Sequence, residues 1–368
     1  MPPRNRPAAP IERVRAAAYR IPTDGLESDG TLAWDSTTLV TVEVEAGGRT
    51  GFGYTYAAAA AAQIAAGPLF EVIQGREALD VPGAWLAMVS QLRNAGRPGV
   101  AATALSAVDA ALWDLKGKLL GLSLSALLGA VREGVPAYGS GGFTSYDPGR
   151  LREQLSGWAA EGFGMVKMKV GRDPVADPDR VTTARRAIGP AVRLFVDANG
   201  AYTAKQALAL AEHFAEQGVT WLEEPVTADD LPGLRLVRLH CPAGMEVAAG
   251  EYGYDLFYFE RMVAAGAVDV LQADATRCLG PTGFLQAAAL AFAHHLPLSS
   301  HCAPSLHAAL LCAAPTAVHA EYFYDHARIE SAYFEGIPFP KDGQLPREGA
   351  GPGLGFVPKR ADLARFAI

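Results

Sequence analysis

Two lysines spaced two residues apart are the first side chains in this sequence that could carry out chemistry. Lys167 and Lys169 lie in Met165–Val170, an apolar run typical of a buried strand. Alternate residues of a strand share a face, and each positive charge makes the other harder to form. We therefore expect the pKa of at least one lysine to fall toward neutrality, as a general base requires. For the pair alone, an edge strand with solvated lysines is the favoured interpretation.

Acidic residues at the ends of later apolar runs reverse that preference. Asp197, Glu223 and Glu251 each close a short run. Barrel enzymes keep their active sites at the carboxyl ends of their strands, so these side chains are expected to meet there. Any one of them alone would more commonly be a helix cap or a surface residue. Three inward carboxylates repel unless a cation binds, and oxygen-only ligands favour Mg²⁺ over zinc.

A carboxylate and an imidazole end the next two runs, as Asp274 and His301. A carboxylate beside a histidine fixes its tautomer and raises its basicity. We expect His301 to lie opposite the lysine run across the barrel, as a second candidate base. A lone histidine there would more commonly be structural. Cys302, its neighbour, is expected to be a buried inert thiol, because no separate base is assigned to it.

The last run ends in His319-Ala320-Glu321. This pattern is similar to half of a zinc deaminase motif. The Pro-Cys-x-x-Cys half is absent, so that function is rejected.

Repeated strand and helix patterns must position these side chains. Helical patterns separate apolar runs at Pro136–Ser140, Met165–Val170, Val192–Asp197, Val219–Glu223, Met245–Ala249, Val268–Gln272, Leu296–Ser300 and Ala317–Glu321. Repeated strand–helix units of about 20–30 residues indicate a parallel barrel. A doubly wound sheet is the competing fold, but no Gly-x-Gly-x-x-Gly follows the first run.

The N-terminal third has a different order. A strand over Ile11–Arg20 precedes a predicted hairpin of Thr38–Val44 and Thr50–Tyr56, with a polar, mobile loop over Thr23–Gly30 between them. Helical patterns follow over residues 57–66, 84–94 and 102–120, the last ending at Gly121. Strands followed by helices predict an α+β domain.

Composition excludes several functional classes. The 368 residues carry a net charge of −7 with a pI near 5.7 and show no basic cluster, which argues against nucleic acid. Four cysteines without a C-x-x-C spacing predict neither a disulfide framework nor structural zinc, and a reducing, cytoplasmic compartment fits. No signal peptide or membrane span is predicted. The longest weakly apolar stretch, Ala57–Phe70, is too short and too weakly hydrophobic to span a bilayer.

The sequence resembles the mandelate racemase subgroup of the enolase superfamily over nearly its whole length. The motifs that carry the resemblance are Ala107–Lys118, Leu127-Leu128-Gly129 and Gly351-Pro352-Gly353-Leu354-Gly355. It implies a (β/α)7β TIM-like barrel with an N-terminal α+β capping domain. The expected division is a disordered tail (1–10), the capping domain (11–130), the barrel with the active site (131–330) and a C-terminal segment packing back on the capping domain (331–368). A homo-oligomer is also expected, because family members usually associate and the alanine-rich helices offer flat apolar faces.

The resemblance also implies a role for each candidate residue. The three carboxylates match the Mg²⁺ ligands, Lys169 and His301 match opposing bases, Asp274 matches the dyad partner of His301, and Lys167 and Glu321 match groups that hold the substrate carboxylate. The expected substrate-binding residues are Lys167, Asn199, Glu321, Asp24 and Tyr54.

These roles predict abstraction of the α-proton of a carboxylate through an enediolate, stabilised by Mg²⁺, by Lys167 and, if it is protonated, by Glu321. Polar residues in the expected lid favour a polyhydroxylated substrate, and so an acid-sugar dehydratase giving a 2-keto-3-deoxy acid. A racemase or epimerase of a 2-hydroxy acid and a non-catalytic binding protein are the alternatives. A cycloisomerase or dipeptide epimerase is disfavoured, because those branches usually place a lysine where the Asp274–His301 dyad stands.

Overall fold

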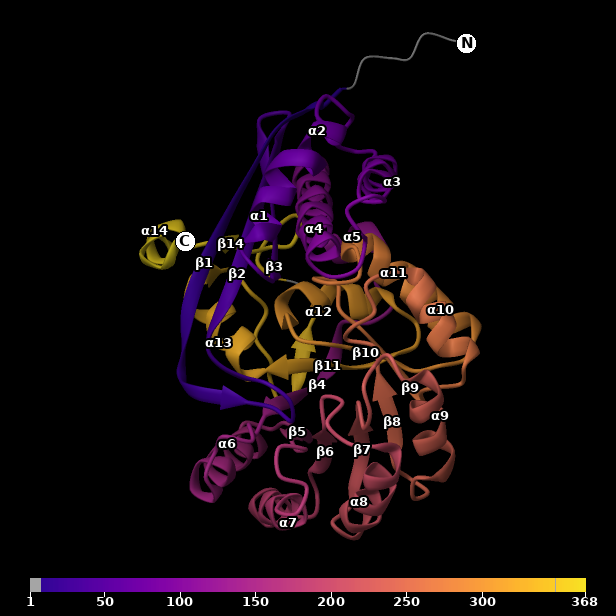
Figure 1. Cartoon of the computed structure of the whole chain (residues 1–368). Helices are drawn as coiled ribbons and strands as arrows, with labels where there is room; N and C mark the ends of the chain where they lie inside the picture. Colours follow the sequence, from indigo (N-terminus) through magenta and orange to yellow (C-terminus); the bar gives the residue numbers. More distant parts are fainter. Residues whose placement is uncertain (1–7, 348) are drawn as a thin grey trace.

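The larger part of the chain is a closed barrel of parallel strands, surrounded by helices (Figure 1). The computed structural model describes residues 8–347 and 349–368. The barrel strands are β4 (Gly134–Gly141), β5 (Met165–Lys169), β6 (Arg193–Asp197), β7 (Val219–Glu223), β8 (Glu246–Ala249), β9 (Val270–Ala273), β10 (Leu298–Ser300) and β11 (Ala317–Phe323). Each pairs with the next in chain order, and β11 pairs with β4 to close the ring. The predicted parallel barrel is confirmed.

One helix follows each barrel strand. They are α6 (Pro148–Ala160), α7 (Asp177–Ile188), α8 (Ala204–Glu216), α9 (Leu231–His240), α10 (Leu256–Ala264), α11 (Gly280–Ala293), α12 (Pro304–Ala313) and, after β11, α13 (Tyr324–Tyr333). Side-chain caps explain several of their starts; Thr203 and Gln206 form a capping box at α8, for example. Within residues 8–347 and 349–368, no helix combines the length and apolar character needed to cross a membrane.

The N-terminal domain is the predicted α+β unit, and it caps one end of the barrel (Figure 1). Its elements are β1 (Ile11–Ser28), β2 (Ala33–Ala46), β3 (Arg49–Tyr56), α1 (Ala60–Ile64), the π-helical turn η1 (Ala65–Leu69), α2 (Phe70–Ile73), α3 (Val81–Gln91), α4 (Val100–Leu120) and α5 (Leu124–Leu128). The three strands form an antiparallel sheet against α4. Gly53 makes this approach possible, because a Cβ there would lie 2.1 Å from the Ala107 carbonyl oxygen. Gly121 ends α4 in the left-handed conformation, as predicted.

The segment predicted as a mobile loop over Thr23–Gly30 is instead ordered and packed. β1 continues to Ser28, and Glu27 pairs with Trp34 of β2, whose indole N–H donates to the Glu27 carboxylate at 2.9 Å. Gly30 is pressed against the barrel: a Cβ there would lie 2.4 Å from the Ala198 carbonyl oxygen. Polar composition suggested a solvated loop, but hydrogen bonds and close packing hold these residues at the barrel mouth.

The first and last described residues both lie against the N-terminal domain. Residues 1–7 of the expected disordered tail lie outside the described residues, whereas Ala8 and Ala9 donate backbone hydrogen bonds to Glu77. The C-terminal elements are β12 (Phe334–Glu335), β13 (Gln344–Pro346), β14 (Val357–Pro358), α14 (Arg360–Leu363) and the 3-10 turn η2 (Ala364–Phe366). Phe334 and Phe356 stack on each other and contact the ring of Phe52 in β3 edge-on. The C-terminal segment therefore shares a core with the capping sheet.

Glu330 on α13 links that sheet to the barrel. Its carboxylate accepts hydrogen bonds from the Tyr54 hydroxyl at 2.7 Å, the Tyr56 hydroxyl at 3.3 Å and the Ser305 backbone N–H at 3.0 Å. Burial raises the pKa of Glu330 to about 7, and the hydrogen bonds only partly offset this.

This raised pKa predicts a pH dependence of stability that depends on Glu330. The folded protein holds the proton up to about pH 7, whereas an unfolded glutamate loses it near pH 4.3. The contribution of Glu330 is therefore complete at low pH and is lost as pH rises through 7. Relative to Glu330→Gln, the wild-type free energy of unfolding should fall by on the order of 3 kcal/mol between pH 4.5 and 8. Urea unfolding across this range measures it, with the exposed Glu335→Gln as control. Parallel pH curves for wild type and Glu330→Gln would contradict it.

Candidate active site

The two lysines of β5 point into a buried cluster of carboxylates. The Lys167 Nζ lies 2.5 Å from Glu223 Oε1, 2.8 Å from Glu321 Oε1 and 3.3 Å from Asp197 Oδ2. The Lys169 Nζ lies 2.6 Å from Asp197 Oδ2. The parallel register explains the cluster, since Lys169 pairs with Asp197 and Asp197 pairs with Glu223. The solvated edge strand is thereby excluded.

The prediction that a lysine pKa falls is wrong for this structure. Burial by itself lowers the pKa of both lysines, but the neighbouring carboxylates outweigh it. Asp197 raises the pKa of Lys169, and Glu223 and Glu321 raise that of Lys167. The prediction rested on the repulsion between the two lysines, whereas the acids on neighbouring strands decide both pKa values.

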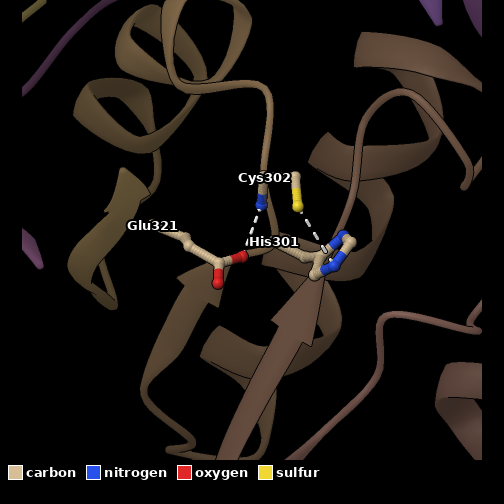
Figure 2. A group of neighbouring side chains, drawn as sticks. All are labelled: His301, Cys302 and Glu321. Carbon is tan, nitrogen blue, oxygen red and sulfur yellow. Dashed lines mark hydrogen bonds between the residues drawn. The ribbon is translucent and has the colours of Figure 1, made fainter. Parts of the chain in front are cut away.

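The condition that Glu321 be protonated is not met in this structure. Burial raises the pKa of Glu321, but Lys167 holds it well below its usual range, so this carboxylate is ionised. The Ser140 hydroxyl donates to Oε1 at 2.6 Å, and the Cys302 backbone N–H donates to Oε2 at 2.7 Å (Figure 2). These donors fix the orientation of Glu321 at the end of β11.

Asp197, Glu223 and Glu251 meet as predicted and form a candidate cation site. One carboxylate oxygen from each lies within 4.8 Å of the others, and all three side chains are buried. Burial and the charge of Asp197 raise the pKa of Glu223, and Glu251 Oε2 has no hydrogen-bond partner. A buried acceptor without a donor is costly, and a cation removes that cost. The oxygen-only set suits Mg²⁺.

Asp274 and His301 form the predicted dyad. His301 Nδ1 lies 2.8 Å from Asp274 Oδ2, and the ionised carboxylate can only accept, so Nδ1 carries the proton. Burial raises the pKa of Asp274, but the hydrogen bond and charge of His301 hold it below its usual range. His301 Nε2 faces the carboxylates, 3.5 Å from Glu251 Oε2. This nitrogen keeps its lone pair toward the site.

Two residues that support this dyad were missed from the sequence. The Arg277 guanidinium lies 3.6 Å from Asp274 and 3.4 Å from Glu251, between the dyad and the carboxylate cluster. His307 Nδ1 donates to the Cys302 carbonyl at 2.9 Å, and its Nε2 accepts from the Ala275 backbone N–H at 2.8 Å. Arg277 stands three residues after Asp274, a spacing that offered a signal. His307 lies inside an apolar helix and offered none.

The predicted substrate-binding residues divide into two groups. Lys167 and Glu321 belong to the carboxylate cluster, and Asn199 donates its backbone N–H to Asp197 at 2.9 Å. Asp24 instead accepts from the Tyr324 hydroxyl on an exposed surface, and Tyr54 is buried against Glu330. The structure brings the first group together and gives the last two other partners.

A cavity of about 580 Å³ lies next to the carboxylate cluster. Its wall includes Asn199, Glu224 and Tyr252, each one or two residues beyond a member of the cation site, and Thr31 of the capping domain. The Oδ1 atom of Asn199 and the Oε1 atom of Glu224 are buried without hydrogen-bond partners. The wall of the cavity is therefore largely polar in residue type.

Two family models match the chain. Residues 150–362 match the model described as enolase C-terminal domain-like, and residues 30–129 match the mandelate racemase/muconate lactonizing enzyme N-terminal domain. Residues 130–149 separate the two matched ranges.

Individual proteins are similar over nearly the full chain. A solved mandelate racemase/muconate lactonizing enzyme-like protein from Rubrobacter xylanophilus is 50% identical, with a TM-score of 0.95 over 98% of this chain and 100% of that one. A 3,6-anhydro-alpha-L-galactonate cycloisomerase from Streptomyces coelicolor is 36% identical over 97% of this chain and 99% of the relative. The L-talarate/galactarate dehydratase structure from Salmonella typhimurium LT2, liganded with Mg and L-lyxarohydroxamate, is 27% identical, with a TM-score of 0.89 over 98% and 93%.

The carboxylate geometry predicts one binding site for Mg²⁺ per chain. Glu251→Gln should weaken binding by at least about 10-fold, because the charge and one ligand oxygen are lost. Isothermal titration calorimetry measures this directly. Glu246→Gln, half-buried on β8 just before Glu251 but outside the cluster, is the matched control. Equal affinities of the two variants would contradict the site.

Proposed function

This chain belongs to the mandelate racemase/muconate lactonizing enzyme family of the enolase superfamily, and we propose that it eliminates a β-oxygen from an acid-sugar carboxylate. The reaction begins with removal of the α-proton. The observation that carries the proposal is the placement of two bases in one buried site, with Lys169 on β5 and His301 on β10. β4 and β11 separate these strands on one side of the ring and β6–β9 on the other, so the two bases face a substrate from different sides.

The side chains of the site account for each proton and electron pair. Lys169 or His301 takes the α-proton, according to the configuration of the α-carbon; Lys169 does so in its neutral form, which a cation engaging Asp197 would favour by weakening the hold of that carboxylate on the ammonium group. Lys167 attracts the substrate carboxylate as negative charge grows on its oxygens, and the ionised Glu321, held by Ser140, positions Lys167. The electron pair of the C–H bond then expels the β-oxygen. His301 gives this oxygen the proton it has just taken or, where Lys169 is the base, a proton that the imidazole already carries. With a free β-hydroxyl the leaving group is water, and the remaining enol gives a 2-keto acid.

Asp197, Glu223 and Glu251 would hold the metal. Mg²⁺, when bound, supplies a Lewis acid that makes the α-proton more acidic. The protein keeps the three carboxylates buried, with Asp197 and Glu223 in register on β6 and β7 and Glu251 just after β8.

Polar groups in the adjoining cavity support a hydroxylated substrate over mandelate. Its wall carries several polar side chains, among them Asp229, Tyr252 and Arg261, which can hydrogen-bond to sugar hydroxyls. An apolar ring placed there would leave these groups without partners. The names of two relatives, a dehydratase of sugar diacids and a cycloisomerase of an anhydro sugar acid, point to the same substrate class.

A cycloisomerase is the second candidate. The Asp274–His301 pair in the sequence disfavours it, but the similarity to a cycloisomerase over nearly the full chain supports it as an alternative. The elimination is the same, except that a ring oxygen leaves the β-carbon and stays attached to the product. Retention of mass in the product separates the two reactions.

A screen of acid sugars tests the proposal. Mono- and diacid sugars and their lactone or anhydro forms are incubated with enzyme and Mg²⁺, and products are detected as 2-keto acids and by mass. We expect loss of one water from an open-chain acid, and no turnover after chelation. Turnover of mandelate with none of any acid sugar would overturn the substrate class. Absence of α-deuterium exchange from every acid would indicate a binding protein.

The two bases predict opposite defects. Lys169→Ala should slow α-deuterium exchange from one configuration by at least about 100-fold, and His301→Asn should do so from the other, because each reaches one face. Glu321→Gln should slow both, since Glu321 positions Lys167, whose positive charge serves both reactions. Proton NMR in deuterated water follows exchange for both epimers of one good substrate. Equal loss from both epimers in the Lys169 and His301 variants would refute the two-sided arrangement.

A further inference from the structure

We propose that His301, Cys302 and Glu321 form a second metal site, distinct from the carboxylate triad, which takes Zn²⁺ and thereby blocks the histidine base. The binding claim does not depend on the proposed reaction; only the inhibition does.

The three side chains converge at the ends of β10 and β11 (Figure 2). Cys302 Sγ lies 3.2 Å from His301 Nε2, and one ligand atom from each of the three residues lies within 4.8 Å of the others. Ligands of tetrahedral zinc at their usual bond lengths lie about 3.5 Å apart. The distance between the Cys302 and His301 ligand atoms is already close to this value, so small shifts of the three side chains suffice to hold an ion.

The donor set selects the metal. An imidazole nitrogen, a thiol sulfur and a carboxylate oxygen are the three ligand types of protein zinc sites. Mg²⁺ avoids sulfur and prefers oxygen, so it favours the carboxylate triad. The donor atoms therefore favour Zn²⁺ at His301, Cys302 and Glu321 and Mg²⁺ at the carboxylate triad, although His301 Nε2 lies only 3.5 Å from Glu251.

Neighbouring residues already orient two of the ligands as zinc requires. Zinc-bound histidines typically donate their other ring N–H to a carboxylate, and His301 Nδ1 does so to Asp274 at 2.8 Å. Nε2 therefore presents its lone pair to the site. Glu321 Oε1 accepts from Lys167 and Ser140, whereas Oε2 accepts only from the Cys302 backbone N–H and so retains a lone pair for an ion.

A strained turn brings the thiol to the histidine. Consecutive residues of a strand point to opposite faces, so Cys302 would ordinarily diverge from His301. Here Cys302 and Ala303 both adopt left-handed conformations, with φ of 51° and 40°. His307 holds this turn by donating to the carbonyls of Cys302 and Ala303 at 2.9 and 3.0 Å. Strain of this kind gathers at functional sites, where the surrounding structure enforces it.

Zinc binding changes the protonation of the thiol and the availability of the histidine. The ion displaces the thiol proton to solvent and bonds to the thiolate. Without the ion, burial and Glu321 raise the pKa of the Cys302 thiol, so it stays protonated and unreactive. With it, the Nε2 lone pair is engaged and cannot accept a substrate proton. Zinc therefore inhibits without displacing Mg²⁺.

Binding is tested on the full chain kept in saturating Mg²⁺. Equilibrium dialysis should find one high-affinity Zn²⁺ per chain, and Co²⁺ should give a sulfur-to-cobalt charge-transfer band. Cys302→Ala should abolish the band and weaken zinc binding at least about 10-fold. Cys302→Ser is a second variant of nearly native size, and circular dichroism checks the folding of both. The matched controls are Cys312→Ala, buried in α12 outside the cluster, and the half-buried Cys241→Ala. An unchanged cobalt band in Cys302→Ser, or its loss in Cys241→Ala, would overturn the site.

Inhibition is the second arm. In the presence of excess Mg²⁺, micromolar Zn²⁺ should stop α-deuterium exchange in the wild type from the configuration that depends on His301, and Cys302→Ser should need at least about 10-fold more zinc. Relief of inhibition by added Mg²⁺, with equal zinc sensitivity in Cys302→Ser, would place zinc in the carboxylate triad and refute the proposal. Complete absence of exchange would refute the proposed function, while the dialysis and cobalt results would still decide the zinc site.

Discussion

The structure depends on an imbalance of buried charge at one end of the barrel. Asp197, Glu223, Glu251 and Glu321 bring four carboxylates together, and Lys167 and Lys169 bring two ammonium groups. If all six are ionised, these groups carry a net charge of −2 among buried side chains, which is costly even with Arg277 beside Glu251. A divalent cation supplies that missing charge. Without the cation, the raised pKa of Glu223 favours a proton on that carboxylate, which neutralises part of the same negative charge.

This imbalance accounts for the order within the site. Each lysine is held by acids on neighbouring strands, so neither moves independently of the cation site. Asp274 and His301 add a pair of their own, and Arg277 lies between that pair and Glu251. The bases are thus tied to the metal ligands by direct contacts, and a change at either is felt by the other.

Sequence reasoning found the barrel and the cation site because both follow from strong local patterns. Carboxylates at the ends of successive apolar runs must meet once the runs form a parallel ring. It failed where the outcome depended on neighbours distant in sequence. The pKa of Lys169 is governed by Asp197 on another strand, Tyr54 is committed to Glu330 on α13, and Glu27 is ordered by Trp34 across a hairpin. Nothing within a few residues of these positions reveals those partners.

The long first strand has a consequence for the pace of turnover. β1 begins in the capping sheet and ends at the barrel mouth, and its pairing with β2 is irregular between Pro22 and Glu27. Beyond that irregularity, Ser28 bonds to Thr144 at 2.6 Å and Gly30 rests on Ala198. An opening of this segment would bend the chain where strand pairing is broken and would break the hydrogen bonds of residues 28–30. Those bonds would then belong to the barrier for product release, and the segment would set the speed of turnover without touching the bond that breaks.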